Sequence, residues 1–144
     1  FLDMNSISAC TQEELEKYKK IELIKNYVET KQIDVKKYND NNNVDTSHII
    51  NGRQLTNIGT FRAYVEAYLK NNSNIHENMT FLVRQLEPTD KGLPIQIYVF
   101  SNDTNWVSYE GIQSDIFDHL IAMANEFGLK IFQNPTGQDF NKLV

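Results

Sequence analysis

The feature that most constrains the fold is a change of hydrophobic period near residue 100. Between residues 93 and 99, apolar side chains occupy every second position: Leu93, Ile95, Ile97 and Val99. This two-residue period is typical of a strand with one buried face. From residue 106 to 127 the apolar positions follow helical spacing instead: Ile112, Ile116, Leu120, Met123, Ala124 and Phe127. Gly128 suits the end of that helix. A strand followed by an amphipathic helix predicts an α+β domain.

Three further strands are predicted around this unit. Residues 79–86 form a second strand, joined to the first by the turn sequence EPTDKG, in which proline, aspartate and glycine favour a tight connection. Short apolar stretches at residues 1–7 and 129–132 predict two more strands. Four segments of the sequence can therefore pair in one antiparallel sheet.

Two more helices are predicted in the N-terminal half. The first covers residues 11–31 and opens with a capping box, in which Thr11 and Glu14 satisfy backbone amides reciprocally. The second covers residues 55–71, whose apolar positions recur at helical spacing. Between them, residues 37–54 are rich in asparagine and predict a long loop or insertion.

The resulting order is β-α-(inserted α)-β-β-α-β, which predicts a ferredoxin-like split βαβ fold with its helices on one face of an antiparallel sheet. Residues 1–7 read as the end of a preceding β-domain or as the first strand. Residues 8–134 form the α/β domain, with an insertion at about 31–70, and residues 135–144 form a C-terminal tail. Since the first residue is Phe1, we interpret the chain as a fragment of a longer protein.

Composition excludes some functional classes. The formal net charge is −5 and the sequence pI is about 5.1, which disfavours nucleic acid because an acidic surface repels phosphates. A single cysteine, Cys10, cannot form an internal disulfide. No apolar run approaches the length of a membrane-spanning helix.

The densest group of titratable residues lies in FSNDTNWVSYEGIQSDIFDHL, residues 100–120. Asp115 and His119 are i,i+4 neighbours on the predicted helix, so they can form a salt-linked pair or provide two metal ligands. A zinc site needs three or four ligands, and His48 and His76 have no matching spacing. We therefore expect a structural pair that faces solvent or an interface, with no metal and no cofactor.

The aromatic and acidic residues at the start of this helix have structural explanations. Trp106 and Tyr109 lie at the loop–helix junction and act either as a core plug or as an anchor for a neighbouring subunit. Glu110 is near the positive end of the helix dipole. A catalytic acid/base pair of Asp103 and Glu110 would need a burying environment that splits their pKa values, and the sequence gives no sign of one.

A family resemblance is carried by GLPIQIYVFSNDTNWVSYEGIQSDIFDHL followed by EFGLKIFQNPTGQDF. These strings resemble the C-terminal cytoplasmic region of the small-conductance mechanosensitive ion channel (MscS) family, in the branch of the miniconductance channels. The segments NGRQLTNIGTFRAYVEAYLKNN and MTFLVRQL are similar to the part that precedes it there. FLDMNSI resembles the point where the family's β-domain passes into its α/β domain.

The resemblance implies a non-enzymatic part of a homo-heptameric channel of the bacterial inner membrane that responds to osmotic stress. The pore helices would precede this region, and the cytoplasmic domains would form a hollow vestibule with side portals for ions and small solutes. The family's closing strand is missing, since the sequence stops soon after Asp139–Phe140. The candidate interface or vestibule-facing residues are then Trp106, Tyr109, Glu110, Asp115, Asp118, His119 and Glu126.

Other functions remain open on the same topology. A ligand-binding regulatory module of the βαββαβ type would need polar groups converging in an apolar cleft. An RNA-binding domain would need aromatics on its central strands and a basic face; Tyr98 and Phe100 offer the first, and the net charge opposes the second. A hydrolase would use the Asp/His group.

Overall fold

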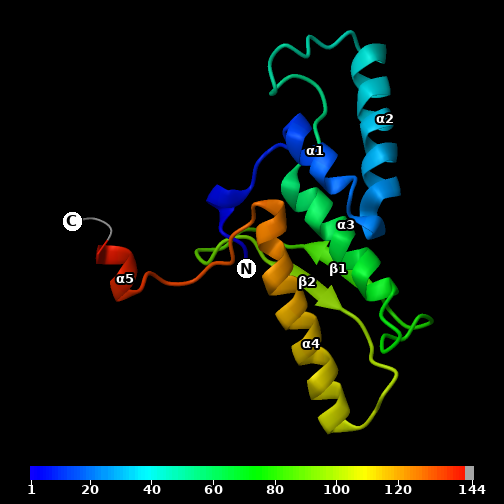
Figure 1. Ribbon diagram of the computed structural model, residues 1–144, viewed down its shortest axis with the longest axis vertical. Helices are drawn as coiled ribbons and strands as arrows, with labels where there is room; N and C mark the ends of the chain where they lie inside the picture. The colour runs from blue at the N-terminus through cyan, green and yellow to red at the C-terminus, as the bar shows by residue number, and fades with distance from the viewer. Residues whose placement is uncertain (142–144) are drawn as a thin grey trace.

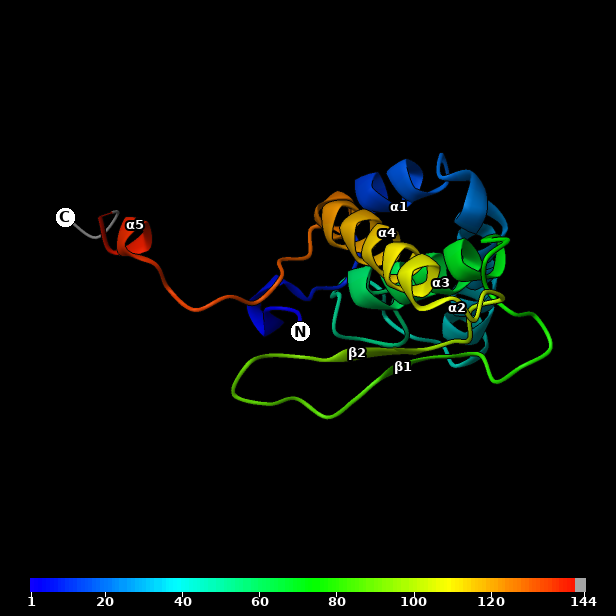
Figure 2. The ribbon, with the colours of Figure 1, turned by 90° about the horizontal axis from the view of Figure 1, so that it is seen from below.

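The predicted β-hairpin forms the sheet of this protein. The computed structural model describes residues 1–141 and shows an α+β fold in which β1 (Leu82–Gln85) pairs antiparallel with β2 (Ile95–Tyr98). The register places Val83 opposite Ile97. All four long helices lie on one side of the hairpin, as the view from below shows (Figure 2).

Two helices supply most of the core against this sheet. They are α3 (Asn57–Lys70) and α4 (Trp106–Ala124), which cross the middle and lower parts of the molecule (Figure 1). Both bury apolar residues at helical spacing, among them Phe61 and Val65 of α3 and Leu120 and Ala124 of α4. The residues predicted for the core face of α4 therefore pack as expected, with Phe127 fully buried just beyond its end.

The single helix predicted over residues 11–31 is wrong, because the backbone bends there. α1 (Gln12–Tyr18) ends early, and α2 (Lys25–Asn41) begins after a 3₁₀ turn, Glu22–Ile24. On one straight helix Ile24 would lie about 240° around the axis from Tyr18, yet both side chains are 1% exposed. The bend lets both reach the same core.

The predicted loop over residues 37–54 is also too long, because α2 continues into it. Near the end of α2 the Asn39 side chain is buried, accepting from the backbone N–H of Arg53 (2.9 Å) and donating to its carbonyl (3.2 Å). The remaining loop leaves the top of α2 and returns to α3 (Figure 1). Since asparagine is a poor helix former, this last part of the helix depends on the loop that packs against it.

The two outer strands are reduced to single bridges. Leu2 bridges Leu93 on one side and Ile131 on the other, both antiparallel. After Leu2 the backbone enters a 3₁₀ turn (Met4–Ser6), which Asp3 caps by accepting from the backbone N–H of Asn5. Within residues 1–141 the regular sheet has two strands, so the antiparallel α+β class is confirmed, and the four-stranded ferredoxin-like sheet is not.

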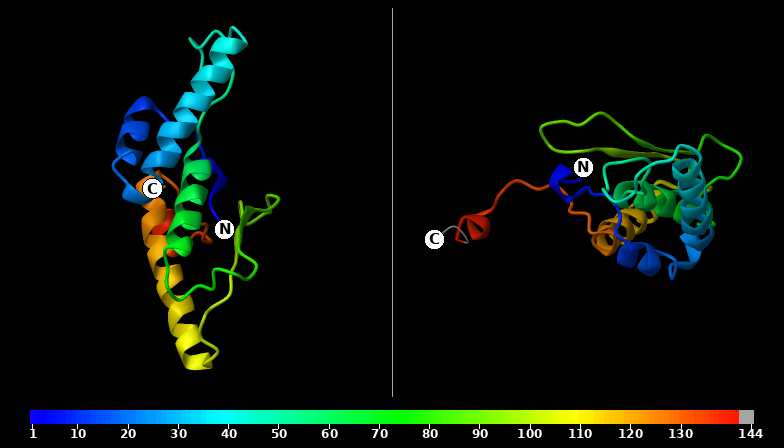
Figure 3. Two further views of the ribbon diagram at one scale, coloured as in Figure 1. Left: turned by 90° about the vertical axis from the view of Figure 1, so that its right-hand side faces the viewer. Right: turned by 90° about the horizontal axis from the view of Figure 1, so that it is seen from above.

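The C-terminal segment leaves the body of the molecule. A four-residue helix, α5 (Gly137–Phe140), lies at the end of an extended stretch, well away from the other helices in every view (Figures 1 and 3). It falls inside the predicted tail 135–144, the last three residues of which lie outside the described part of the protein.

Candidate interface on helix α4

Helix α4 carries most of the predicted site residues, and its two ends are well defined. The Asn105 side chain accepts from the backbone N–H groups of Val107 (3.1 Å) and Ser108 (3.2 Å). At the other end Gly128 adopts a left-handed conformation with φ 67°, which glycine reaches without strain. Buried packing between these ends fixes which residues of α4 remain at the surface.

His119 points toward α3. Its Nε2 atom lies 2.7 Å from the Tyr64 hydroxyl, and its ring stacks on Tyr68 with a centroid distance of 4.2 Å. Burial raises the pKa of Tyr64, so its phenol keeps the proton that it can donate to His119. Among residues 1–141 no ion pair joins Asp115 to His119, so the predicted salt-linked pair is wrong: the stronger partners come from α3.

The acidic residues do not gather into a metal or acid/base centre. Glu110, Asp115 and Asp118 are all exposed on α4. Glu126 instead forms an ion pair with Lys17 of α1 at 3.1 Å, and the same lysine donates to the Glu126 carbonyl. In the part of the protein that the structure describes, no group of three or more histidine, cysteine, aspartate or glutamate residues can hold a metal.

Trp106 is at the surface and does not plug the core. Its side chain is 74% exposed and that of Val107 is 76% exposed, while Tyr109 is 42% exposed. Sequence reasoning missed Phe117 and Ile121, which are about half exposed on the same helix. Their spacing from Trp106 places them on one face of α4, outside the core stripe, a pattern that was available in the sequence.

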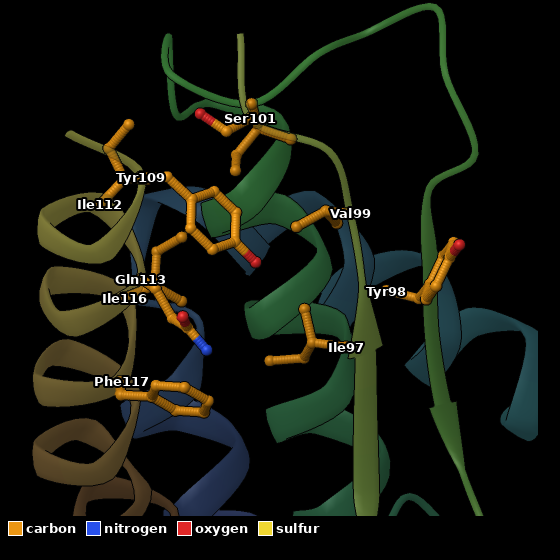
Figure 4. A pocket seen from close by; sticks show the side chains of 10 residues that line it. Ile97, Tyr98, Val99, Ser101, Tyr109, Ile112, Gln113, Ile116 and Phe117 are labelled. Atoms are coloured by element: carbon orange, nitrogen blue, oxygen red, sulfur yellow. The ribbon is translucent and has the colours of Figure 1, made fainter. Parts of the chain in front are cut away.

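A groove runs between this helix and β2. A cavity of about 230 Å³ is bounded by Tyr109, Gln113 and Phe117 on the helix and by Ile97 and Val99 on the strand side (Figure 4). The Tyr109 hydroxyl and the Gln113 amide point into it, whereas the Tyr98 side chain points to the other side of the strand (Figure 4). The groove is thus apolar with two polar tips.

A second, smaller hollow continues this surface toward the N-terminus. It holds about 90 Å³ and shares Ile97 and Phe117 with the first cavity, while Phe1, Ile121 and Ile131 form other parts of its lining. Phe1 is 55% exposed and Ile131 is 39% exposed. One apolar surface therefore extends from α4 to both ends of the body of the fold.

Comparison with known families assigns the protein. No helix in residues 1–141 has the length and apolar character that a bilayer crossing requires. No solved structure matches the sequence. The family model described as "Mechanosensitive ion channel MscS, C-terminal" matches residues 58–131, just over half of the sequence. The match includes the hairpin, the whole of α4 and nearly all of α3. The chain therefore belongs to the MscS mechanosensitive ion channel family and contains its C-terminal domain.

Proposed function

We propose that the protein is a soluble vestibule domain on the cytoplasmic side of the bacterial inner membrane, within a homo-heptameric channel that responds to osmotic stress. Its role is subunit assembly and the filtering of ions and solutes, without catalysis. Membrane helices that precede this region in the full channel would hold the copies together at the pore. The observation that carries the proposal is the exposed apolar surface of α4, in a sequence that contains a channel-family domain.

Assembly would use what we call the α4 apolar face: Trp106, Val107, Phe117 and Ile121. These side chains are between 50% and 76% exposed, and large apolar groups gathered on one surface favour a protein interface. Aromatic residues are also enriched among interface anchors. Glu110 and Gln113 lie beside this face as a polar rim, the arrangement typical of an interface with an apolar centre.

Filtering would use the acidic side of α4. Asp115 and Asp118 are exposed, and each copy adds a formal charge of −5. Several copies around one vestibule would concentrate cations within a Debye length of about 8 Å at physiological salt. Glu126 contributes less to this field, because Lys17 neutralises it.

The finer topology is part of the same proposal. The bridges place Leu2 between Leu93 and Ile131, and β2 pairs with β1 on its other side. This order supports a split βαβ sheet whose two outer strands are one bridge long. The apolar hollow beside Leu2 and Ile131 would then be closed by a neighbouring copy.

Sedimentation of the purified protein over a range of concentrations tests the assembly role. We expect reversible self-association that Val107→Ser weakens at least about tenfold, because an exposed interface residue loses its apolar contact area. The matched control is Ala122→Ser, which changes an exposed position on the acidic side of the same helix. Equal association of both variants would contradict the role of the α4 apolar face.

A ligand-binding regulatory module is the second candidate function. The groove between α4 and β2 supports it, because the Tyr109 hydroxyl and the Gln113 amide point into an otherwise apolar cavity (Figure 4). A thermal-shift screen with small metabolites tests it. Stabilisation by a compound that fails to stabilise Gln113→Leu would favour this function.

A further inference from the structure

The loop between α2 and α3 contains a reactive dipeptide, Asn51–Gly52. It is the one place in the sequence where glycine follows asparagine. The amide carbon of an asparagine is open to attack by the backbone nitrogen of the next residue, and a Cβ on that residue obstructs the approach. Glycine has no Cβ, so the obstruction is missing at this position alone.

The local structure leaves the attacking nitrogen available. Among residues 1–141 the Gly52 N–H has no hydrogen-bond partner, whereas the N–H groups of Asn51 and Arg53 on either side are both bonded. Asn51 is half-buried in a surface loop and its amide group donates to the Asp45 carbonyl at 2.9 Å. Water therefore reaches a segment whose nucleophile is not held by the fold.

We propose that Asn51 is a site of spontaneous deamidation. The Gly52 nitrogen forms a bond to Cγ of Asn51, the bond between Cγ and Nδ2 breaks, and ammonia leaves with the proton from the Gly52 amide. Water then opens the cyclic imide at one of its two carbonyls, which gives aspartate or isoaspartate at position 51. The balance is one water consumed and one ammonia released, with one negative charge added.

The modification acts on the contacts that hold the loop to α2. A carboxylate cannot donate to the Asp45 carbonyl, so the Asn51 bond is lost and two oxygens face each other. Isoaspartate also lengthens the backbone next to Arg53, whose N–H and carbonyl both bond Asn39. Gly52 is tightly packed against the same Asn39 side chain. Deamidation therefore loosens this loop and leaves the family-matched region 58–131 in place.

Peptide mapping of the aged protein tests the proposal. The purified protein is incubated in mildly alkaline buffer, and mass spectrometry with isoaspartate labelling follows each asparagine. The internal comparison is Asn72, which is also half-buried but precedes Ser73. We expect Asn51 to convert about tenfold faster than Asn72, because only Asn51 precedes a residue without a Cβ. Retention of Asn51 through the incubation, or faster conversion at Asn72, would overturn the proposal.

A second measurement follows the structural consequence. Trypsin cleaves after Arg53, and this cleavage should speed up in the aged protein in step with conversion at Asn51. Asn51→Asp should show the faster cleavage without ageing, and Asn51→Gln should stop the time-dependent increase. Ageing that speeds cleavage equally in Asn51→Gln would overturn the assignment to this residue.

Discussion

The contact between Tyr64 and His119 explains why a histidine on an acidic helix is turned inward. The tyrosine hydroxyl lies 2.7 Å from Nε2, and the imidazole stacks on Tyr68. The pair joins α3 to α4 at the position from which the sequence suggested a metal site or an ion pair. The geometry assigns His119 to the packing of α4, whose outer face forms the proposed interface.

Removal of the hydroxyl tests this contact. We expect Tyr64→Phe to lower the free energy of unfolding by about 1 kcal/mol, the usual net value of one intramolecular hydrogen bond. Denaturant unfolding measures it, and Tyr98→Phe is the control because that residue is 49% exposed. An equal change in both variants would show that the hydrogen bond to His119 does not stabilise the fold.

The buried thiol predicts a pH dependence at the alkaline end. Burial raises the pKa of Cys10 from its ordinary 9.0 to about 11, so the fold disfavours the thiolate. The free energy of unfolding from this group is fully present below pH 9 and is lost as the pH rises toward 11. Burial of Tyr18 acts in the same direction.

Unfolding curves across this pH range isolate the cysteine. In Cys10→Ala the loss of stability with rising pH should be smaller than in the unaltered protein, since only the tyrosine contribution remains. Identical slopes would mean that the thiol titrates normally in the folded protein.

At the scale of the elements, the N-cap of α4 is the local feature on which the proposed interface depends. Asn105 satisfies two backbone N–H groups directly before Trp106. We expect Asn105→Ala to lower the free energy of unfolding by about 1 kcal/mol, whereas Asn105→Asp keeps the acceptor and should be nearly neutral. Thermal unfolding of the two variants compares them, and equal melting temperatures would contradict the cap.

Elements defined by local signals were predictable from the sequence. The capping box at Thr11 and Glu14, the hairpin, and the span of α4 up to Gly128 all depend on residues a few positions apart. Their periodicity and turn chemistry therefore contain enough information.

Features that depend on distant partners were not predictable. The bend between α1 and α2 exists because Tyr18 and Ile24 share one core, and the end of α2 depends on the contact of Asn39 with Arg53. The partner of His119 comes from α3, 55 residues away. Exposure of Trp106 likewise follows from how α4 lies on the sheet, which a single segment does not specify.

At the scale of the whole molecule, the acidic side of α4 predicts an effect on ion preference. In the full channel, combined Asp115→Asn and Asp118→Asn should shift the reversal potential toward weaker cation preference, because the vestibule loses exposed negative charge. Glu126→Gln is the matched control, since Lys17 already neutralises that carboxylate. Unchanged reversal potentials in the double variant would count against filtering by this surface.

The central claim is that copies of this domain meet through the α4 apolar face, and photo-crosslinking in the intact channel tests it most directly. A photoreactive amino acid would replace Val107, which is 76% exposed, and in a second sample Ala122 on the acidic side. The account predicts a ladder of crosslinked multimers from position 107 and little crosslinking from position 122. A single monomer band from position 107, in channels that still assemble, would contradict it.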